Sequence, residues 1–190
     1  MRSAILTGIL ALALPFASAQ TSTWVSDSAH SEVDFSVTHL TIANVHGRFG
    51  KVAATLLYDQ ADPARSTVKT TIDVSTVDTG EPGRDTDLKS ARFFDTAQFQ
   101  TASFESTSVA RDGDGLAVSG NLTLHGITRP VVLKVEGPTG PVEGMDHKQH
   151  SGFSATTTIS RSAFGIGANV PPTIVGDAIK LSIDLDVAKQ

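Results

Sequence analysis

The stretch Ala178–Lys189, AIKLSIDLDVAK, alternates apolar and polar residues without a break from Ile179 to Val187. Every second residue from Ile179 to Val187 is apolar, and the residues between them are lysine, serine or aspartate. A period of two is that of a β-strand, whose successive side chains point to opposite faces. A strand with one apolar and one polar face is typical of an antiparallel sheet that is wet on one side.

The same alternation recurs through the chain from Ser31 onward. Turn-forming pairs interrupt it, most clearly the Asp-Gly pairs of Asp112–Gly115, which indicate a tight hairpin. Residues 83–98, GRDTDLKSARFFDTAQ, depart from the alternation and contain helix formers, which predicts a short helix there. About eight strands are predicted, over residues 31–40, 48–59, 66–77, 101–110, 115–124, 129–137, 151–160 and 177–188.

Eight one-sided strands can hide their apolar faces by closing into a barrel or by stacking as two sheets. Long strands and a single helical insertion favour the barrel, which also removes exposed strand edges. The expected fold is therefore all-β: an eight-stranded antiparallel barrel with a short helical insertion. Eight strands suffice to enclose one small ligand.

The N-terminal residues 1–19, MRSAILTGILALALPFASA, have the features of a secretory signal peptide. One cation, Arg2, precedes an apolar run, and Ala17-Ser18-Ala19 forms a small-residue cleavage site. No later stretch approaches the 18 or so apolar residues of a membrane-spanning helix. We expect a mature domain of residues 20–190 that is periplasmic or secreted, without stable membrane insertion.

Charge and cysteine content exclude several classes of function. The formal net charge is −5, and losing Arg2 with the signal peptide leaves −6, with the cations scattered along the chain. Nucleic acid is therefore an unexpected partner, because phosphate binding needs a cationic patch. The chain has no cysteine, which excludes thiol chemistry and disulfides.

Several separated segments resemble the YceI-like family of exported proteins. They are DSAHSEVDFSVTHL (27–40), VHGRFG (45–50), VDTGEPGRDTDLKSARFFD (77–95), GNLTLHGITRPV (120–131) and ISRSAFGIG (159–167). The resemblance implies a lipocalin-like antiparallel barrel that binds a polyisoprenoid or other long amphiphile in its interior. The chain departs from the family pattern at Asp87, where the family usually has histidine, and at Phe99-Gln100, where it usually has Tyr-Pro.

Two polar residues lie on strand faces that are otherwise apolar. His39 follows Val33, Phe35 and Val37 in the alternation, so it is expected to point into the barrel near its end. It is either a neutral core histidine or a contact for a ligand head group. Arg161 continues the inward face of its strand and needs a partner there. That partner is either a carboxylate in a salt bridge that closes the barrel end, or an anionic group of the ligand.

The helical insertion begins with Arg84 and Asp85, which are expected to fix it to the barrel as an ion pair or helix cap. The alternative is a gate beside a ligand entrance, with an apolar lip. The residues expected to bind the ligand are Phe35, Val37, His39, Phe49, Leu88, Phe93, Phe94, Phe104, Leu122, Arg161 and Phe164.

Catalytic and metal motifs are weak in this chain. The segment HKQHSG (147–152) reads as a solvated loop rather than a metal site, and His30 reads as a strand-end hydrogen-bonding residue. A single Asp-Thr-Gly at 78–80 lacks the second copy that an aspartic protease needs. We expect no catalytic residue, no metal and no cofactor apart from a bound isoprenoid lipid.

The expected function is to sequester or carry a long-chain polyisoprenoid, quinone-like or polyprenyl, or a related amphiphilic lipid. An enzyme acting on such a lipid is one rival, and a filled-core stress-response or interaction module is another. A homodimer is possible, because the loop GPTGPVEGMDHKQHSG (137–152) or a free strand edge could mediate one.

Overall fold

The computed structural model describes residues 21–190, so the predicted signal peptide, residues 1–19, lies outside the described residues. The described chain contains one α-helix, α1 (Pro82–Lys89), and three short 3-10 turns: η1 (Pro63–Arg65), η2 (Val74–Thr76) and η3 (Ser162–Phe164). The strands are β1 (Ser22–Ser26), β2 (Glu32–His39), β3 (Ala43–Phe49), β4 (Val52–Tyr58), β5 (Thr67–Asp73), β6 (Thr101–Asp112), β7 (Gly115–Leu124), β8 (Ile127–Glu143), β9 (Gln149–Ser160) and β10 (Val175–Lys189).

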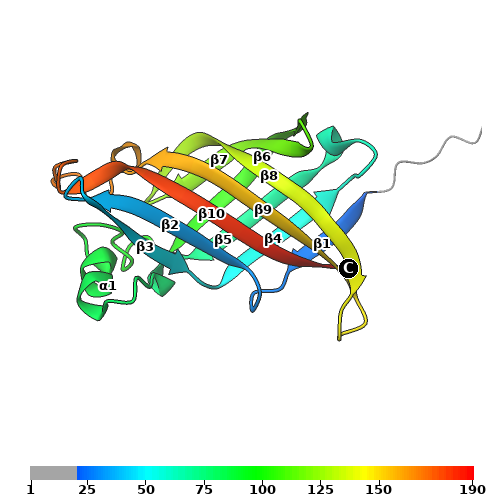
Figure 1. Ribbon diagram of the computed structural model, residues 1–190, viewed down its shortest axis with the longest axis horizontal. Coiled ribbons are helices and arrows are strands. Elements are labelled where there is room, and N and C mark those ends of the chain that lie inside the picture. Colours follow the sequence, from blue (N-terminus) through cyan, green and yellow to red (C-terminus); the bar gives the residue numbers. More distant parts are fainter. Residues whose placement is uncertain (1–20) are drawn as a thin grey trace, which may run out of the picture.

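Eight of these strands close into an antiparallel barrel, as predicted (Figure 1). The cyclic order is β1-β4-β5-β6-β7-β8-β9-β10, and β10 returns to β1 through three residue pairs from Trp24–Lys189 to Ser26–Val187. Because β10 is long, its earlier part from Val175 to Asp184 has the same edge free to pair with β2. β10, the strand whose alternation decides the fold, is therefore paired with both β1 and β2.

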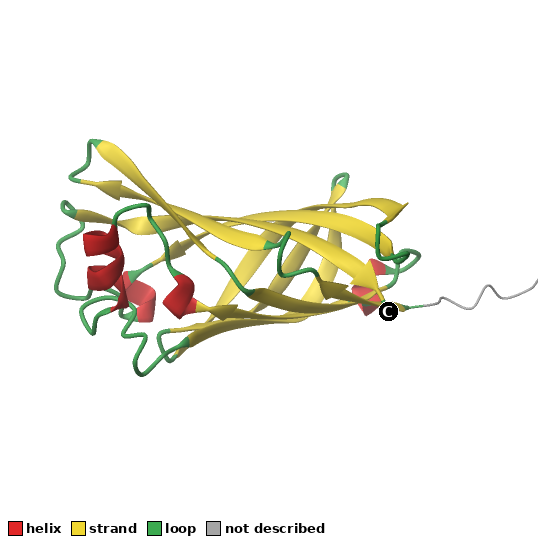
Figure 2. Ribbon diagram, turned by 90° about the horizontal axis from the view of Figure 1, so that it is seen from below, coloured by secondary structure: helices red, strands yellow, loops and turns green. Residues whose placement is uncertain are grey.

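The hairpin of β2 and β3 extends the wall beyond β1, toward the end of the barrel where α1 lies (Figure 1). Beside it, the isolated bridge between Arg48 and Asp78 connects β3 to the segment that leads into α1. Figure 2 shows α1 at this end of the molecule, against the open ends of the strands. We call this the cap end, and the opposite end, which carries η1, the distal end.

The alternation did not separate every strand. The predicted strand 48–59 begins inside β3, because the turn at Gly50-Lys51 lacks a strong turn signal; Lys51 itself adopts the left-handed conformation, with φ of 53°. The five-residue β1 is too short to show a period. The predicted strand 129–137 continues as β8 to Glu143, into the segment expected to be a loop, and its register shifts there because bulges accommodate prolines within a strand.

The helix is shorter than the predicted 83–98. It begins at Pro82, after Glu81 accepts a hydrogen bond from the amide of Gly83, and it ends at Lys89. None of its residues is fully buried, so its own packing contributes little to its stability. The chain from Ser90 to Gln98 forms successive turns that bring Phe93 and Phe94 under the barrel end.

None of the helices in residues 21–190 is both long enough and apolar enough to cross a membrane.

Candidate functional site

Two apolar cavities lie inside the barrel. The cap cavity has a volume of about 100 Å³ and is lined at its outer end by Leu88, Phe93 and Phe94. The distal cavity has a volume of about 120 Å³ and extends to Tyr58 and Phe153. Four residues belong to both walls, so the cavities abut along the barrel: Val33, Ile72, Leu122 and Leu181.

Each cavity is large enough for a segment of hydrocarbon. A void needs about 10–15 Å³ to admit one water, and an apolar void of about 150 Å³ holds a six-carbon ring while staying dry. In proportion, volumes of about 100 and 120 Å³ correspond to roughly four or five carbons each. The interior is neither plugged nor a wide channel: it is a narrow apolar space interrupted by side chains.

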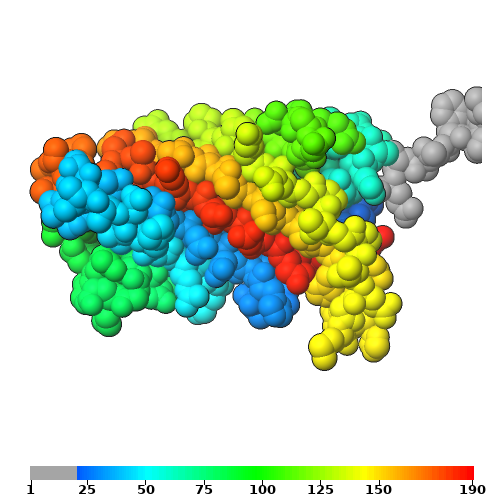
Figure 3. Space-filling model, in the orientation of Figure 1, coloured from blue at the N-terminus to red at the C-terminus, as the bar shows by residue number. Residues whose placement is uncertain are grey.

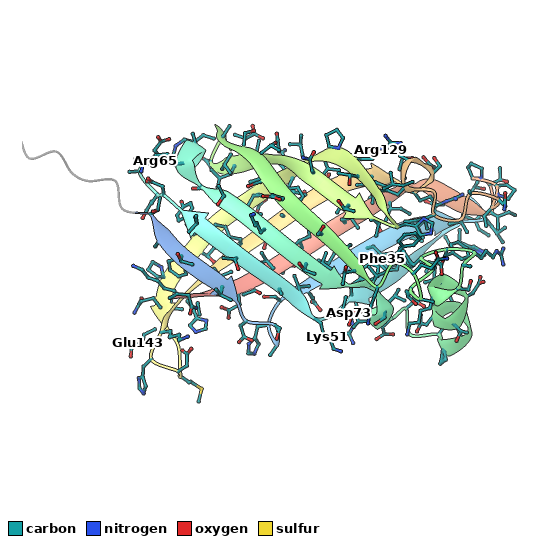
Figure 4. All side chains as sticks on the ribbon, turned by 180° about the vertical axis from the view of Figure 1, so that it is seen from behind. Phe35, Lys51, Arg65, Asp73, Arg129 and Glu143 are labelled. Carbon is teal, nitrogen blue, oxygen red and sulfur yellow. The ribbon has the colours of Figure 1, made fainter. Side chains whose placement is uncertain are left out.

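Four phenylalanines line the cap cavity, and three of them have rings in contact with one another. The rings of Phe35 and Phe49 lie 5.4 Å apart, and those of Phe49 and Phe94 lie 5.5 Å apart in an edge-to-face arrangement. Figure 4 places Phe35 at this end of the barrel, while Arg65 marks the distal end. Phe94 is only half-buried, so the apolar wall continues to the surface beside α1.

Two glycines give the aromatic rings their space. Gly47 on β3 lies under the ring of Phe35, and Gly120 on β7 lies under the ring of Phe104. A Cβ at either glycine would overlap the ring. These glycines therefore set how deeply Phe35 and Phe104 enter the two cavities.

The distal cavity ends at a more polar boundary. The ring of Tyr58 meets that of Phe153 edge to face at 5.8 Å, and burial raises the pKa of the Tyr58 phenol. Next to it, the buried Asp59 carboxylate accepts hydrogen bonds from the amides of Ala61 and Asp62 and lies 3.5 Å from Arg65 Nε. These groups close the distal end of the barrel.

Arg161 lines the cap cavity and is only 3 % exposed. The expected salt bridge is wrong, because the guanidinium donates to backbone carbonyls and to no carboxylate of the described chain. The five acceptors are the carbonyl oxygens of Ile166, Gly167, Val170, Val175 and Gly176. All five N–H groups of the guanidinium are thus engaged, and none is left for an anionic ligand group.

The loop around Arg161 is also held by an acidic residue, Asp177. Asp177 accepts hydrogen bonds from the hydroxyl of Ser160 at 2.6 Å and from the amide of Ser162 at 3.0 Å. The Ser160 hydroxyl and then Ser162 lower the pKa of Asp177, and the nearby Arg161 contributes in the same direction. Arg161 and Asp177 together fix the segment that covers the cap cavity opposite α1.

The helical insertion is fastened through Thr79. Asp85 accepts hydrogen bonds from the amide and hydroxyl of Thr79, and Arg84 donates to the hydroxyl and carbonyl oxygens of the same residue. Arg84 and Asp85 thus fix the insertion by hydrogen bonds to a third residue rather than as an ion pair. Asp87, at the position of the family's histidine, makes an exposed 3.5 Å ion pair with Arg92.

Most residues expected to bind a ligand line the cavities, and Leu122 lines both. The cap cavity contacts Phe35, Val37, Phe49, Leu88, Phe93, Phe94, Leu122 and Arg161, and the distal cavity contacts Phe104 and Leu122.

Two of the expected residues do not line either cavity. His39 is exposed, because β2 runs past the barrel body and His39 pairs with Ala43 near the hairpin tip. Phe164 is buried in η3, and its carbonyl oxygen meets His125 Nδ1 at 3.0 Å. His39 stays in a paired strand that runs beyond the barrel body, whereas the alternation no longer applies to Phe164 in its 3-10 turn.

The expected set included Val37, Leu88 and Leu122 but missed several other wall residues. Val33, Ile72 and Leu181 separate the two cavities, and Tyr58 and Phe153 close the distal one. The alternation places several of these on inward faces, but it does not distinguish a wall residue from a filled core. That distinction depends on how neighbouring strands align.

The comparisons with known proteins agree with this architecture. A family model described as "YceI-like domain" matches residues 24–187. A UPF0312 protein of Vibrio vulnificus is 35% identical, over 98% of this chain and 96% of its own length. The crystal structure of Burkholderia cenocepacia BcnA has a TM-score of 0.75 and 26% identity, and the alignment covers 85% of this chain and 98% of that one.

A more distant structure has the same fold. It is described as a polyisoprenoid binding domain from Saccharophagus degradans, implicated in plant cell wall breakdown. Its TM-score is 0.63 at 16% identity, with 90% of this chain and 100% of that chain covered.

Proposed function

Because the chain belongs to the YceI-like family, we propose that its barrel binds one long-chain polyisoprenoid, quinone-like or polyprenyl, or a related amphiphilic lipid. The protein sequesters or carries this lipid in the periplasm or outside the cell, after export directed by residues 1–19. It acts as a binding protein rather than an enzyme.

The abutting apolar cavities carry this proposal. They run from the phenylalanines beside α1 to Tyr58, and their common wall consists of four aliphatic side chains. A thin, branched hydrocarbon fits such a space better than a compact polar molecule does. The polyisoprenoid binding described for the Saccharophagus degradans domain, which has the same fold, supports the choice of ligand class.

The energy of burial is sufficient for useful affinity. Burial contributes roughly 0.8 kcal/mol per CH₂, so about twelve carbons contribute on the order of 10 kcal/mol before the cost of association. Subtracting about 4 kcal/mol, the low end of the association cost, leaves about 6 kcal/mol, which corresponds to a dissociation constant of tens of micromolar without a specific polar contact. Two cavities of roughly four or five carbons each hold fewer than twelve carbons, so a chain of that length must displace wall side chains or extend past the cap end.

We place the entrance at the cap end. Leu88 and Phe94 are half-buried there, and the covering segments are an eight-residue helix and a loop rather than paired strands. At the distal end, β1 joins β10 to β4 and completes the hydrogen-bonded wall. The lipid tail therefore enters beside α1, and its head group stays near the surface.

The two rival functions make different demands on the interior. A filled-core interaction module requires side chains to occupy the space where the two cavities lie. An enzyme requires a titratable group positioned for proton transfer beside the ligand. His39, Asp85 and Arg161 are the polar residues that the sequence places nearest the cap end. Among the described residues, no hydrogen bond joins any two of them.

Mass spectrometry of organic extracts tests the proposal. The mature protein is purified from its native host without detergent and extracted alongside an equal amount of the same protein purified after urea unfolding and refolding. We expect an isoprenoid-type lipid near one equivalent in the first sample and none in the second. Equal lipid in both samples, or none in either together with no uptake of added polyprenol, would contradict it.

A further inference from the structure

A group of metal-ligating side chains lies outside the barrel, at the side where β1 meets β10. Asp27 and His30 come from the loop between β1 and β2, and Asp186 comes from β10. One ligand atom from each of the three residues lies within 4.8 Å of the other two. Asp27 and His30 are three residues apart in one loop, and the barrel closure brings the distant Asp186 beside them.

The backbone fixes the positions of these residues. The amide of Asp27 donates to the carbonyl oxygen of Asp186 at 2.8 Å, and the Ser31 hydroxyl donates to the same oxygen at 3.2 Å. The amide of Asp186 in turn donates to the Ser31 hydroxyl at 3.2 Å. The loop that carries Asp27 and His30 is therefore tied to β10 on both sides of the cluster.

A second histidine supports the cluster from the hairpin between β8 and β9, which projects from the barrel in Figure 3. His150 Nδ1 lies 2.7 Å from Asp186 Oδ1, and His150 Nε2 lies 3.0 Å from Asp146 Oδ1. The His150 side chain is only 16 % exposed, unlike that of His147, which is 89 % exposed. The reading of this segment as a solvated loop thus applies to His147 but not to His150.

The chemistry of the group suits a divalent transition-metal ion. Zn²⁺ takes imidazole nitrogen and carboxylate oxygen at about 2.0–2.2 Å in tetrahedral geometry, so two of its ligand atoms lie about 3.4 Å apart. The ligand atoms of the cluster lie within 4.8 Å of one another, and an ion would draw the more distant ones together by about 1 Å. A histidine that hydrogen-bonds a ligating carboxylate, as His150 does with Asp186, is the usual support around such ions.

We infer that Asp27, His30 and Asp186 bind one divalent transition-metal ion, with Zn²⁺ the best fit, and that His150 orients Asp186. Three protein ligands leave a coordination position for water. An open groove of about 580 Å³, lined by His30, His150 and Asp186, borders the site and gives solvent access to that position. The ion would clamp the β1–β2 loop to β10 where the barrel closes, independently of any lipid in the interior.

Surface ion pairs alone do not account for this arrangement. His30 is 70 % exposed and pairs with Asp27 at 2.8 Å, and an exposed pair of that kind contributes little to stability. Two carboxylates and a histidine from two separate segments, with a fourth residue holding one of the carboxylates, form a more specific arrangement than either pair needs. A bound cation would contact all three side chains at once.

Calorimetric titration with Zn²⁺ tests the inference on the mature protein stripped with EDTA. We expect one equivalent to bind, with a matching mass increase in native mass spectrometry and a higher melting temperature. His30→Gln and Asp186→Asn should each weaken binding by about tenfold or more. Substituting Co²⁺ should give the visible absorption of a coordinated ion in the wild type and lose it in His30→Gln.

The matched control is His147→Gln, which removes an exposed histidine of the neighbouring hairpin that pairs with Glu143. It should bind Zn²⁺ as the wild type does. Equal affinity in the wild type and His30→Gln would overturn the inference, as would an equal loss in His147→Gln. Because His30 is exposed, His30→Gln should fold normally, and circular dichroism checks this.

Discussion

The ring of Phe35 lies directly on the backbone of Gly47, its cross-strand partner, so closely that no side chain fits between them. The backbone of Gly47 therefore supports Phe35, which lines the cap cavity. The depth of the cavity depends on this contact between β2 and β3.

Gly47→Ala should therefore move Phe35 into the cap cavity. We expect the free energy of unfolding to fall by about 1–3 kcal/mol, as for other overpacking substitutions. Urea denaturation measures this change. Gly50→Ala is the matched control, because a Cβ at Gly50 meets no atom within 4 Å, and it should leave stability nearly unchanged. Equal stability of the two variants would show that Phe35 has room elsewhere.

Arg161 should be a major source of stability at the cap end. Arg161→Met leaves five buried or half-buried carbonyl oxygens without their donor, and each lost partner of this kind costs about 1–3 kcal/mol. We expect a loss of at least about 3 kcal/mol, with Arg161→Lys intermediate because lysine has three donors instead of five. Denaturant unfolding at neutral pH measures both, and a fully stable Arg161→Met would contradict the described role.

Asp177 should make stability depend on pH in the acid range. Its pKa in the folded protein lies below the ordinary value of an aspartate, chiefly because the Ser160 hydroxyl donates a hydrogen bond to the carboxylate. The contribution is therefore present above the unfolded pKa and is lost as pH falls through the folded pKa. Asp177→Asn should be less stable than the wild type near pH 7, and the difference should shrink toward about pH 3. A difference that stays constant across this range would rule out the Asp177 ionisation as its source.

The connection between Asp85 and Thr79 should hold α1 on the barrel. Because no residue of α1 is fully buried, loss of this hydrogen bonding should release the helix locally without unfolding the barrel. We expect Asp85→Ala to speed amide hydrogen exchange in residues 82–98 by about tenfold while the exchange of β7 and β9 is unchanged. Asp87→Ala, which removes only an exposed ion pair, is the control. Exchange that rises equally in both variants would argue against a specific role for Asp85.

The sequence predicts the closed barrel because the alternation in β10 indicates a strand with one apolar and one polar face. Leu181 and its alternate neighbours face inward in an order that only a strand explains, and the same period recurs in β7 and β9. The turn-forming Asp112–Gly115 also predicts its hairpin correctly. Local periodicity and turn chemistry depend only on residues that are close in the sequence, so they can be predicted from the sequence alone.

Positions that depend on distant segments could not be predicted in this way. His39 shares the period of Val37, but the hairpin carries it beyond the barrel, and strand length at the end of a sheet is set by pairing with β10. The partners of Arg161 are carbonyls of a loop that has no period. The shape of the cavities depends on how side chains from eight strands pack together. The alternation of a single strand does not predict that packing.

The most direct test of the central claim is equilibrium binding of a polyprenol to Ile72→Phe and Thr71→Phe. Ile72 belongs to the common wall of the two cavities, and Thr71 is its exposed neighbour on β5, so the same ring is added inside or outside the barrel. If the hydrocarbon lies in the interior, Ile72→Phe binds at least about tenfold more weakly than the wild type while Thr71→Phe binds equally well. Undiminished binding by a folded Ile72→Phe would contradict a lipid held inside the barrel.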